Sequence, residues 1–183
     1  MNNIECLKKE IREIISRSEV PEDPLHAQNT LDWLLILEPD ADEALQIAAL
    51  GHDIERAVES RKVEHEDYAE FDVFKDAHAK NSARILEEMM QAQCFPQNLI
   101  DEVVGLVNCH ETGGDPRSDL IRDADGLSFF DVNLPFYFER EGWEKSLERC
   151  RWGYARLSLD SRRMVREFAY ESEEIGDLLQ YVF

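Results

Sequence analysis

The pair His52-Asp53 constrains the fold of this chain more than any other stretch, because it closes an apolar run over residues 44–51. That run predicts a buried helix, and an imidazole and a carboxylate at its end can both reach one divalent cation if other segments bring further ligands. The other ligand-type residues follow in order, each on its own predicted helix: His26 upstream, and His78, His110 and Asp125 downstream. The order predicts that several helices meet at one metal site.

Apolar residues recur at helical spacing along most of the chain. Helices are expected over residues 3–18, 23–37, 41–60, 77–90, 96–110, 118–131, 140–157 and 160–181. Residues 61–76 are strongly charged and predict a loop with at most one short helical turn, and the aromatic run from Phe129 to Phe138 predicts a bend. No stretch shows the sustained period-two alternation of a strand, and no repeat of fixed period is present. We therefore expect an all-α protein.

The composition is that of a single acidic domain. A chain of 183 residues, of which 43% are hydrophobic, can bury a core without subdivision, and no linker rich in Pro, Gly or Ser divides residues 1–183. A net charge of −20 repels DNA, RNA and anionic membranes. The dense basic clusters, Arg61-Lys62 and Arg162-Arg163, are too short for an extended nucleic-acid groove.

The sequence carries no indication of export or membrane insertion. Its start is typical of neither a signal peptide nor a transit peptide, and no apolar run approaches the roughly 20 residues that a membrane span needs. Four cysteines are scattered without CxxC spacing: Cys6, Cys94, Cys109 and Cys150. They predict buried free thiols in a reducing compartment, so we expect a soluble cytoplasmic protein.

The ordered ligands, closed by Ala124-Asp125-Gly126-Leu127, resemble the pattern of the HD superfamily of metal-dependent phosphohydrolases. The resemblance covers about residues 25–127 and implies a helical bundle of the HD type, with flanking helices at both ends. It implies that one divalent metal is held by four residues: His26, His52, Asp53 and Asp125. It further implies that His78 and His110 match the additional pair of two-metal subgroups, in which Asp53 would bridge both ions.

Two other residues bear on this ligand set. Asp123 is close enough in sequence to compete with Asp125 as the last ligand, although the Ala-Asp-x-Leu spacing favours Asp125 and leaves Asp123 as a supporting residue. His65 falls outside the order, in the charged stretch, and is expected to be solvated.

The resemblance implies a chemistry as well as a fold. A metal in such a site acidifies its water to a nucleophile at neutral pH and polarises a phosphoryl oxygen, a combination that suits phosphoester hydrolysis by metal-bound hydroxide. The expected cofactor is one or two divalent ions of Mn, Fe, Co, Ni or Mg. The expected substrate is a small phosphorylated metabolite or nucleotide whose identity the sequence leaves open, as it does the oligomeric state.

Arg56 lies three positions after Asp53, where some one-metal nucleotidases of the superfamily carry an acidic residue. A cation here is instead typical of two-metal or diester-cleaving members, so we expect Arg56 to hold a substrate phosphate. Asp53 and Arg56 are therefore the expected catalytic residues. Gly126 stands where relatives often carry an arginine, so that one familiar anion contact is missing.

Two alternatives use the same ligands. Diiron oxygenases of the HD fold, similar to myo-inositol oxygenase, share the His, His-Asp, His, His, Asp order and activate dioxygen. A metal-binding regulatory module without catalysis would also retain the pattern. Ligand types do not fix the redox chemistry, so the sequence leaves these alternatives open.

Overall fold

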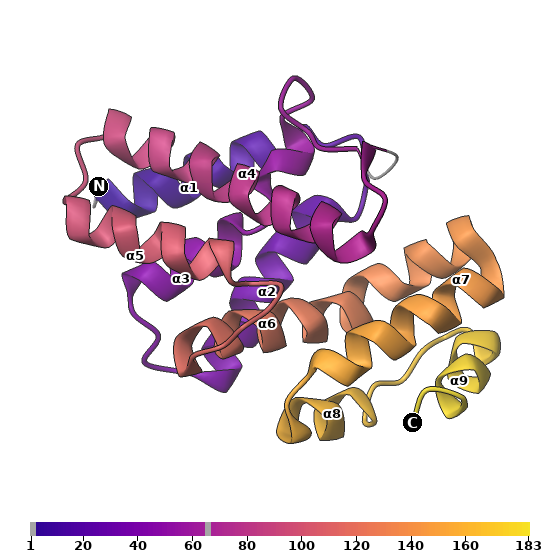
Figure 1. Cartoon of the computed structure of the whole chain (residues 1–183). Coiled ribbons are helices and arrows are strands. Elements are labelled where there is room, and N and C mark those ends of the chain that lie inside the picture. The colour runs from indigo at the N-terminus through magenta and orange to yellow at the C-terminus, as the bar shows by residue number, and fades with distance from the viewer. Residues whose placement is uncertain (1–2, 65–66) are drawn as a thin grey trace.

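The computed structural model describes residues 3–64 and 67–183, and helices make up most of both ranges (Figure 1). The elements are α1 (Asn3–Ile15), α2 (Asp23–Leu37), α3 (Glu43–Gly51), the 3-10 turn η1 (Ile54–Ala57), α4 (Phe71–Ala92), α5 (Gln97–Asn108), α6 (Pro116–Ser128), the π-helical turn η3 (Phe129–Asn133), α7 (Leu134–Arg156), α8 (Leu159–Val165) and α9 (Glu173–Gln180). None of the described residues belongs to a strand. The expectation of an all-α protein is therefore confirmed.

Helix α3 is shorter than the helix expected over residues 41–60. Its N-cap residue Asp42 accepts a hydrogen bond from the Leu45 amide, and the helix ends at Gly51. A Cβ added to Gly51 would lie 2.8 Å from Leu86 Cδ2, so glycine lets α4 approach closely at this point. His52 and Asp53 consequently lie in the turn that joins α3 to η1, and not inside a continuous helix.

Residues 71–76, expected to be part of a charged loop, form the first turns of α4 instead. Aromatic packing outweighs the polar composition here: the ring of Phe71 lies 5.1 Å from that of Trp152, and the rings of Tyr68 and Phe74 are 6.0 Å apart. The longer α4 brings Lys75 to the same region as His78. His65 lies outside the described residues.

The C-terminal third also differs from the expected pattern. The aromatic stretch expected as a bend forms η3 and the start of α7, and α7 reverses direction at Gly142, whose φ of 76° is readily adopted by glycine (Figure 1). The helix expected over residues 160–181 is split into α8 and α9. Between them the Tyr170 hydroxyl donates to the Phe130 carbonyl oxygen at 2.7 Å, and Ser172 caps α9.

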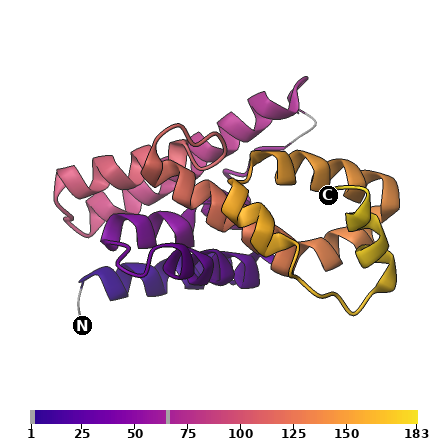
Figure 2. The ribbon, with the colours of Figure 1, turned by 90° about the horizontal axis from the view of Figure 1, so that it is seen from below.

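Two hydrophobic clusters meet along α2. The larger one packs α1 to α6 together around buried side chains such as Leu34, Leu50 and Leu86. The smaller one begins at Leu127 and includes residues of η3 and α7 to α9. Trp33 and Leu37 of α2 pack against both clusters, which joins the C-terminal helices to the rest of the fold. Figure 2 shows the C-terminal helices beside the N-terminal ones.

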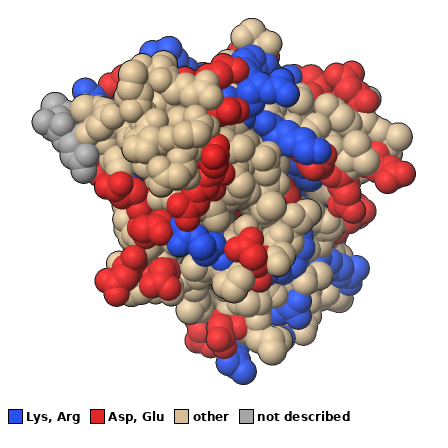
Figure 3. Space-filling model, turned by 60° about the vertical axis from the view of Figure 1, so that its left-hand side comes forward, with Lys and Arg blue, Asp and Glu red and all other residues tan. Residues whose placement is uncertain are grey.

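The described surface is acidic and carries free cysteines. On the face in Figure 3, acidic side chains are widely distributed, while basic ones form a short band near the top and smaller groups elsewhere. Among the described residues, every helix is too short or too polar to span a lipid bilayer. All four thiols are free, but the expected burial is confirmed only for Cys150: Cys6 and Cys109 are half-buried and Cys94 is exposed.

Candidate metal centre

The structure brings together all six ligand-type residues of the ordered set. His26 comes from the first turn of α2, His52 and Asp53 from the turn after α3, His78 from α4, His110 from just beyond α5, and Asp125 from α6. The ligand atoms of His26, His52 and Asp125 lie within 4.8 Å of one another, and those of Asp53, His78 and His110 form a second such group. Two groups of three ligands therefore lie side by side.

Backbone carbonyl groups fix the tautomers of two of the histidines. His52 Nδ1 lies 2.9 Å from the Ala49 oxygen, and His110 Nδ1 lies 2.7 Å from the Val107 oxygen. Because a carbonyl oxygen only accepts hydrogen bonds, each Nδ1 carries the proton that is donated. Each Nε2 is then left with a lone pair, as a metal ligand requires.

Side chains orient the other two histidines in the same way. His26 Nδ1 lies 2.8 Å from Ser128 Oγ, whose own hydroxyl donates to the His26 carbonyl oxygen at 3.2 Å, so the imidazole must be the donor to Ser128. His78 Nδ1 lies 2.6 Å from Glu55 Oε1, and a carboxylate accepts that proton. All four imidazoles are thus held through Nδ1, which directs their Nε2 atoms to the centre.

The Nε2 atoms are arranged as ligands of a cation. His26 Nε2 and His52 Nε2 lie only 3.2 Å apart, although the tautomers above give both atoms lone pairs. Such an approach is repulsive unless a positive charge lies between the atoms. The buried Nε2 of His110 makes no well-aligned hydrogen bond within the described residues, although Glu111 Oε1 lies 3.3 Å from it. Imidazole nitrogens combined with carboxylate oxygens are donors for divalent transition metals, so these residues fit a metal ion.

Asp53 lies between the two ligand groups. Its Oδ1 is 2.7 Å from His78 Nε2, 3.6 Å from His52 Nε2 and 3.7 Å from His110 Nε2. Its Oδ2 is 3.9 Å from His26 Nε2. This one carboxylate therefore approaches all four imidazoles, as a bridging ligand would.

The distances also show which of Asp123 and Asp125 faces the histidines. Asp125 Oδ1 lies 3.2 Å from His26 Nε2 and 3.5 Å from His52 Nε2. Asp123 instead accepts hydrogen bonds from the Ser158 amide at 3.0 Å and from Ser161 Oγ at 2.8 Å, at the start of α8. The structure therefore directs Asp125 to the centre and uses Asp123 to hold α8.

The electrostatics of the centre favour positive charge. Burial by itself would lower the pKa of His52, but the adjacent Asp53 and Asp125 raise that pKa to about 9. Burial likewise opposes ionisation of Asp53, yet His52 and His78 hold the pKa of its carboxyl well below the usual value. A group of buried carboxylates that stabilises imidazolium has a negative potential, to which a divalent cation is also attracted.

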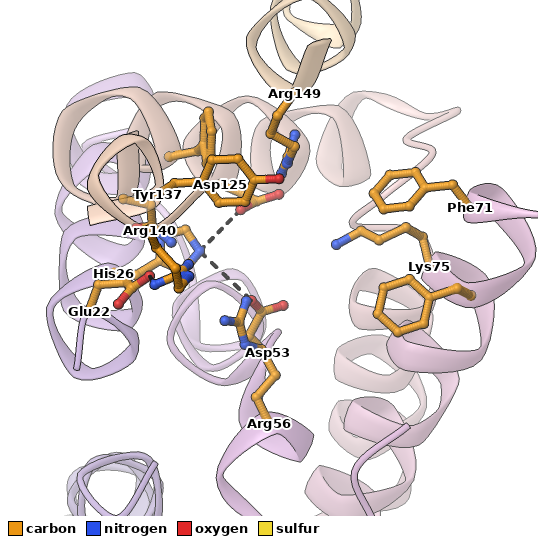
Figure 4. Close-up of a pocket in the computed structure, with 13 residues that line it drawn as sticks. Glu22, His26, Asp53, Arg56, Phe71, Lys75, Asp125, Tyr137, Arg140 and Arg149 are labelled. Carbon is orange, nitrogen blue, oxygen red and sulfur yellow. Dashed lines mark hydrogen bonds and ion pairs between the residues drawn. The ribbon is translucent and has the colours of Figure 1, made fainter. Parts of the chain in front are cut away.

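A cavity of about 190 Å³ opens beside the centre (Figure 4). His26, Asp53 and Asp125 line one side of it; the remaining lining residues are Glu22, Arg56, Phe71, Phe74, Lys75, Phe129, Asn133, Tyr137, Arg140 and Arg149. Arg56, expected to hold a phosphate, does reach this cavity, but its Nη2 lies 2.9 Å from Asp23 Oδ1 and its Nη1 lies 3.4 Å from Asp53 Oδ2. Its guanidinium is therefore engaged by two carboxylates.

Five further residues of this region were not assigned to it from the sequence. Glu55 holds His78, and Glu111 forms ion pairs with Lys75 and with Arg156, the latter at 2.8 Å. Arg149 enters the cavity from α7. Glu55 lies in η1, a 3-10 turn, which directs its side chain toward His78 of α4. The sequence signal that could have identified Glu55 is its position two residues after Asp53.

Glu55 offers a test of how the histidines are positioned. Glu55→Gln is expected to weaken metal binding about tenfold to a hundredfold, because an amide is a poorer partner for the His78 Nδ1 proton. Competition with a chromophoric chelator would measure the affinity, and Glu59→Gln, at an exposed position of the same segment, is the matched control. Wild-type affinity in Glu55→Gln would show that His78 is not a metal ligand or needs no such support.

A family model described as a domain of unknown function, DUF4202, matches residues 7–178. The match spans nearly the whole chain and includes every ligand-type residue of the centre, so the chain belongs to this family. No curated protein and no solved structure matches the chain.

Proposed function

We propose that this member of the DUF4202 family is a metal-dependent phosphohydrolase that acts on small phosphorylated compounds. The observation that carries the proposal is the convergence of four imidazole Nε2 atoms and two carboxylates, each imidazole held through Nδ1, beside a cavity lined by cations. The sequence order of these ligands resembles that of the HD superfamily, and their arrangement in space supports the same assignment.

The two ligand groups define which residues would hold metal. His26, His52 and Asp125 would bind one ion, His78 and His110 a second, and Asp53 would contact both. When bound, the metal lowers the pKa of a coordinated water and polarises a phosphoryl oxygen, which is the chemistry of phosphoester hydrolysis.

The walls of the cavity select for a small anion. Its volume of about 190 Å³ is below the roughly 300–1,000 Å³ of pockets that take drug-sized ligands. Lys75 and Arg149 reach into the cavity from α4 and α7, where they offset the charge of an anionic substrate in a chain with a net charge of −20 (Figure 4). Tyr137 and Phe129 add aromatic surface to the lining of the cavity.

Metal analysis of the purified protein, combined with a panel of phosphomonoesters and phosphodiesters, tests this function. The protein loaded separately with Mn, Fe, Co, Ni or Mg is expected to release phosphate or cleave a diester, and a chelator should abolish the activity. Dioxygen consumption by the iron-loaded protein without cleavage of any phosphoester would instead indicate an oxygenase. Tight metal binding with neither activity would indicate a regulatory module.

A further inference from the structure

Arg149 differs from the other cations of the cavity in that no carboxylate of residues 3–64 or 67–183 forms an ion pair with it. Lys75 pairs with Glu111, and Arg56 and Arg140 have carboxylates at 2.9 and 3.0 Å. No carboxylate in the described ranges forms an ion pair with Arg149, although Asp125 and Glu111 attract it at longer range. A guanidinium that is not already engaged by an acidic side chain is the group best able to receive an incoming anion.

Aromatic stacking holds this guanidinium in place. Its central carbon lies 4.3 Å from the centre of the Phe129 ring and 4.6 Å from that of Trp152. A Cβ added at Gly153, one helical turn further along, would lie 3.3 Å from Arg149 Nη1, so glycine leaves room for the side chain. Stacking occupies the faces of the guanidinium and leaves its N–H edges free to donate in the plane, which suits a phosphate oxygen.

We infer that Arg149 is the anion-binding residue of the cavity and binds the phosphoryl group of the substrate next to the metal centre. The phosphoester part of this inference rests on the proposed function, whereas the binding of a tetrahedral oxyanion does not. Two parts of the chain would then form the site. The metal ligands come from the segment that runs from α2 to α6, and the anion contact comes from the part of α7 that follows Gly142. In Figure 4, Arg149 descends from α7 toward Asp125.

The direct test is to measure the binding of inorganic phosphate to the 183-residue chain by isothermal titration calorimetry, with and without added manganese. Arg149→Met keeps the length of the side chain but removes its charge and donors, and is expected to weaken phosphate binding at least tenfold. Arg149→Lys should recover part of the affinity, because it restores the charge without the planar donor geometry. Arg163→Met, which removes an exposed arginine paired with Asp160, is the matched control and should bind phosphate normally.

Metal content and circular dichroism of each variant separate anion binding from a structural role. The inference is overturned if Arg149→Met binds phosphate like the wild type while Arg56→Met does not, because Arg56 would then be the anion contact. It is also overturned if Arg149→Lys, which retains the charge, loses metal or folded structure along with phosphate. If phosphate binding depends on Arg149 but no phosphoester is cleaved, the inference stands and the proposed function fails.

Discussion

Asp53→Ala is expected to reduce the metal content of the purified protein to less than a tenth of the wild-type value and to abolish phosphoester cleavage. Its carboxylate lies within 4 Å of the Nε2 atoms of the four histidines of the centre, so it can contribute to both ligand groups. Without it, imidazole lone pairs would face one another with less negative charge to hold a cation. Mass spectrometry of metals after gel filtration would measure the content.

Two further variants make the result for Asp53 specific. Asp53→Asn keeps the size of the side chain and should lose metal almost as completely, because an amide oxygen carries no net charge. Asp76→Ala removes an exposed carboxylate of α4 that pairs with Lys80, and should retain full metal content. Full metal occupancy in Asp53→Ala would contradict the assignment of the centre.

The convergence of the ligand-type residues could be predicted because two patterns coincide in the sequence. Residue types suited to metal binding recur in a fixed order, and apolar periodicity indicates which helical faces are turned inward. His52 shows the combination, since it follows a run of fully buried residues and is itself buried. The order matched that of the HD superfamily, and this resemblance indicated which helices converge.

The end of α3 could not be predicted in the same way. Apolar residues continue at helical spacing beyond Gly51, and Ile54 is fully buried, so the pattern favoured one helix through residue 60. The break arises from tertiary contacts: Asp53 turns toward His78, and Glu55 both accepts the His78 proton and receives the Val63 amide at 2.9 Å. Such contacts between distant segments leave no periodic signal in the sequence.

The cations of the cavity were missed for a related reason. Lys75 and Arg149 belong to segments with many charged residues, and nothing in their local sequence distinguishes a side chain in a cavity from one in solvent. Their positions depend on the extension of α4 to Phe71 and on the reversal of α7 at Gly142. Arg56, by contrast, was correctly placed near the centre because it lies one short turn after Asp53, but its pairing with Asp23 was not foreseeable.

His110→Ala is expected to lower the metal-to-protein ratio by about half while the remaining ion stays bound by His26, His52, Asp53 and Asp125. The reason is that His110 belongs, with His78 and Asp53, to the second ligand group. Its buried Nε2 faces two carboxylates, with Glu111 Oε1 at 3.3 Å and Asp53 Oδ1 at 3.7 Å, so a cation between these groups suits its position. Two ions held about 3.5–4 Å apart could stabilise both the attacking and the leaving oxygen.

His78→Ala provides the second half of the experiment, because it removes the other imidazole of the same group. Both variants should retain one ion per chain and lose most of the phosphoester cleavage, whereas the matched variant His26→Ala should affect the first ion. If His78→Ala and His110→Ala keep the wild-type ratio while turnover falls, the centre holds a single ion. The two imidazoles would then contact the substrate or protonate the leaving group, since a histidine beside the reacting phosphate can act as a general acid.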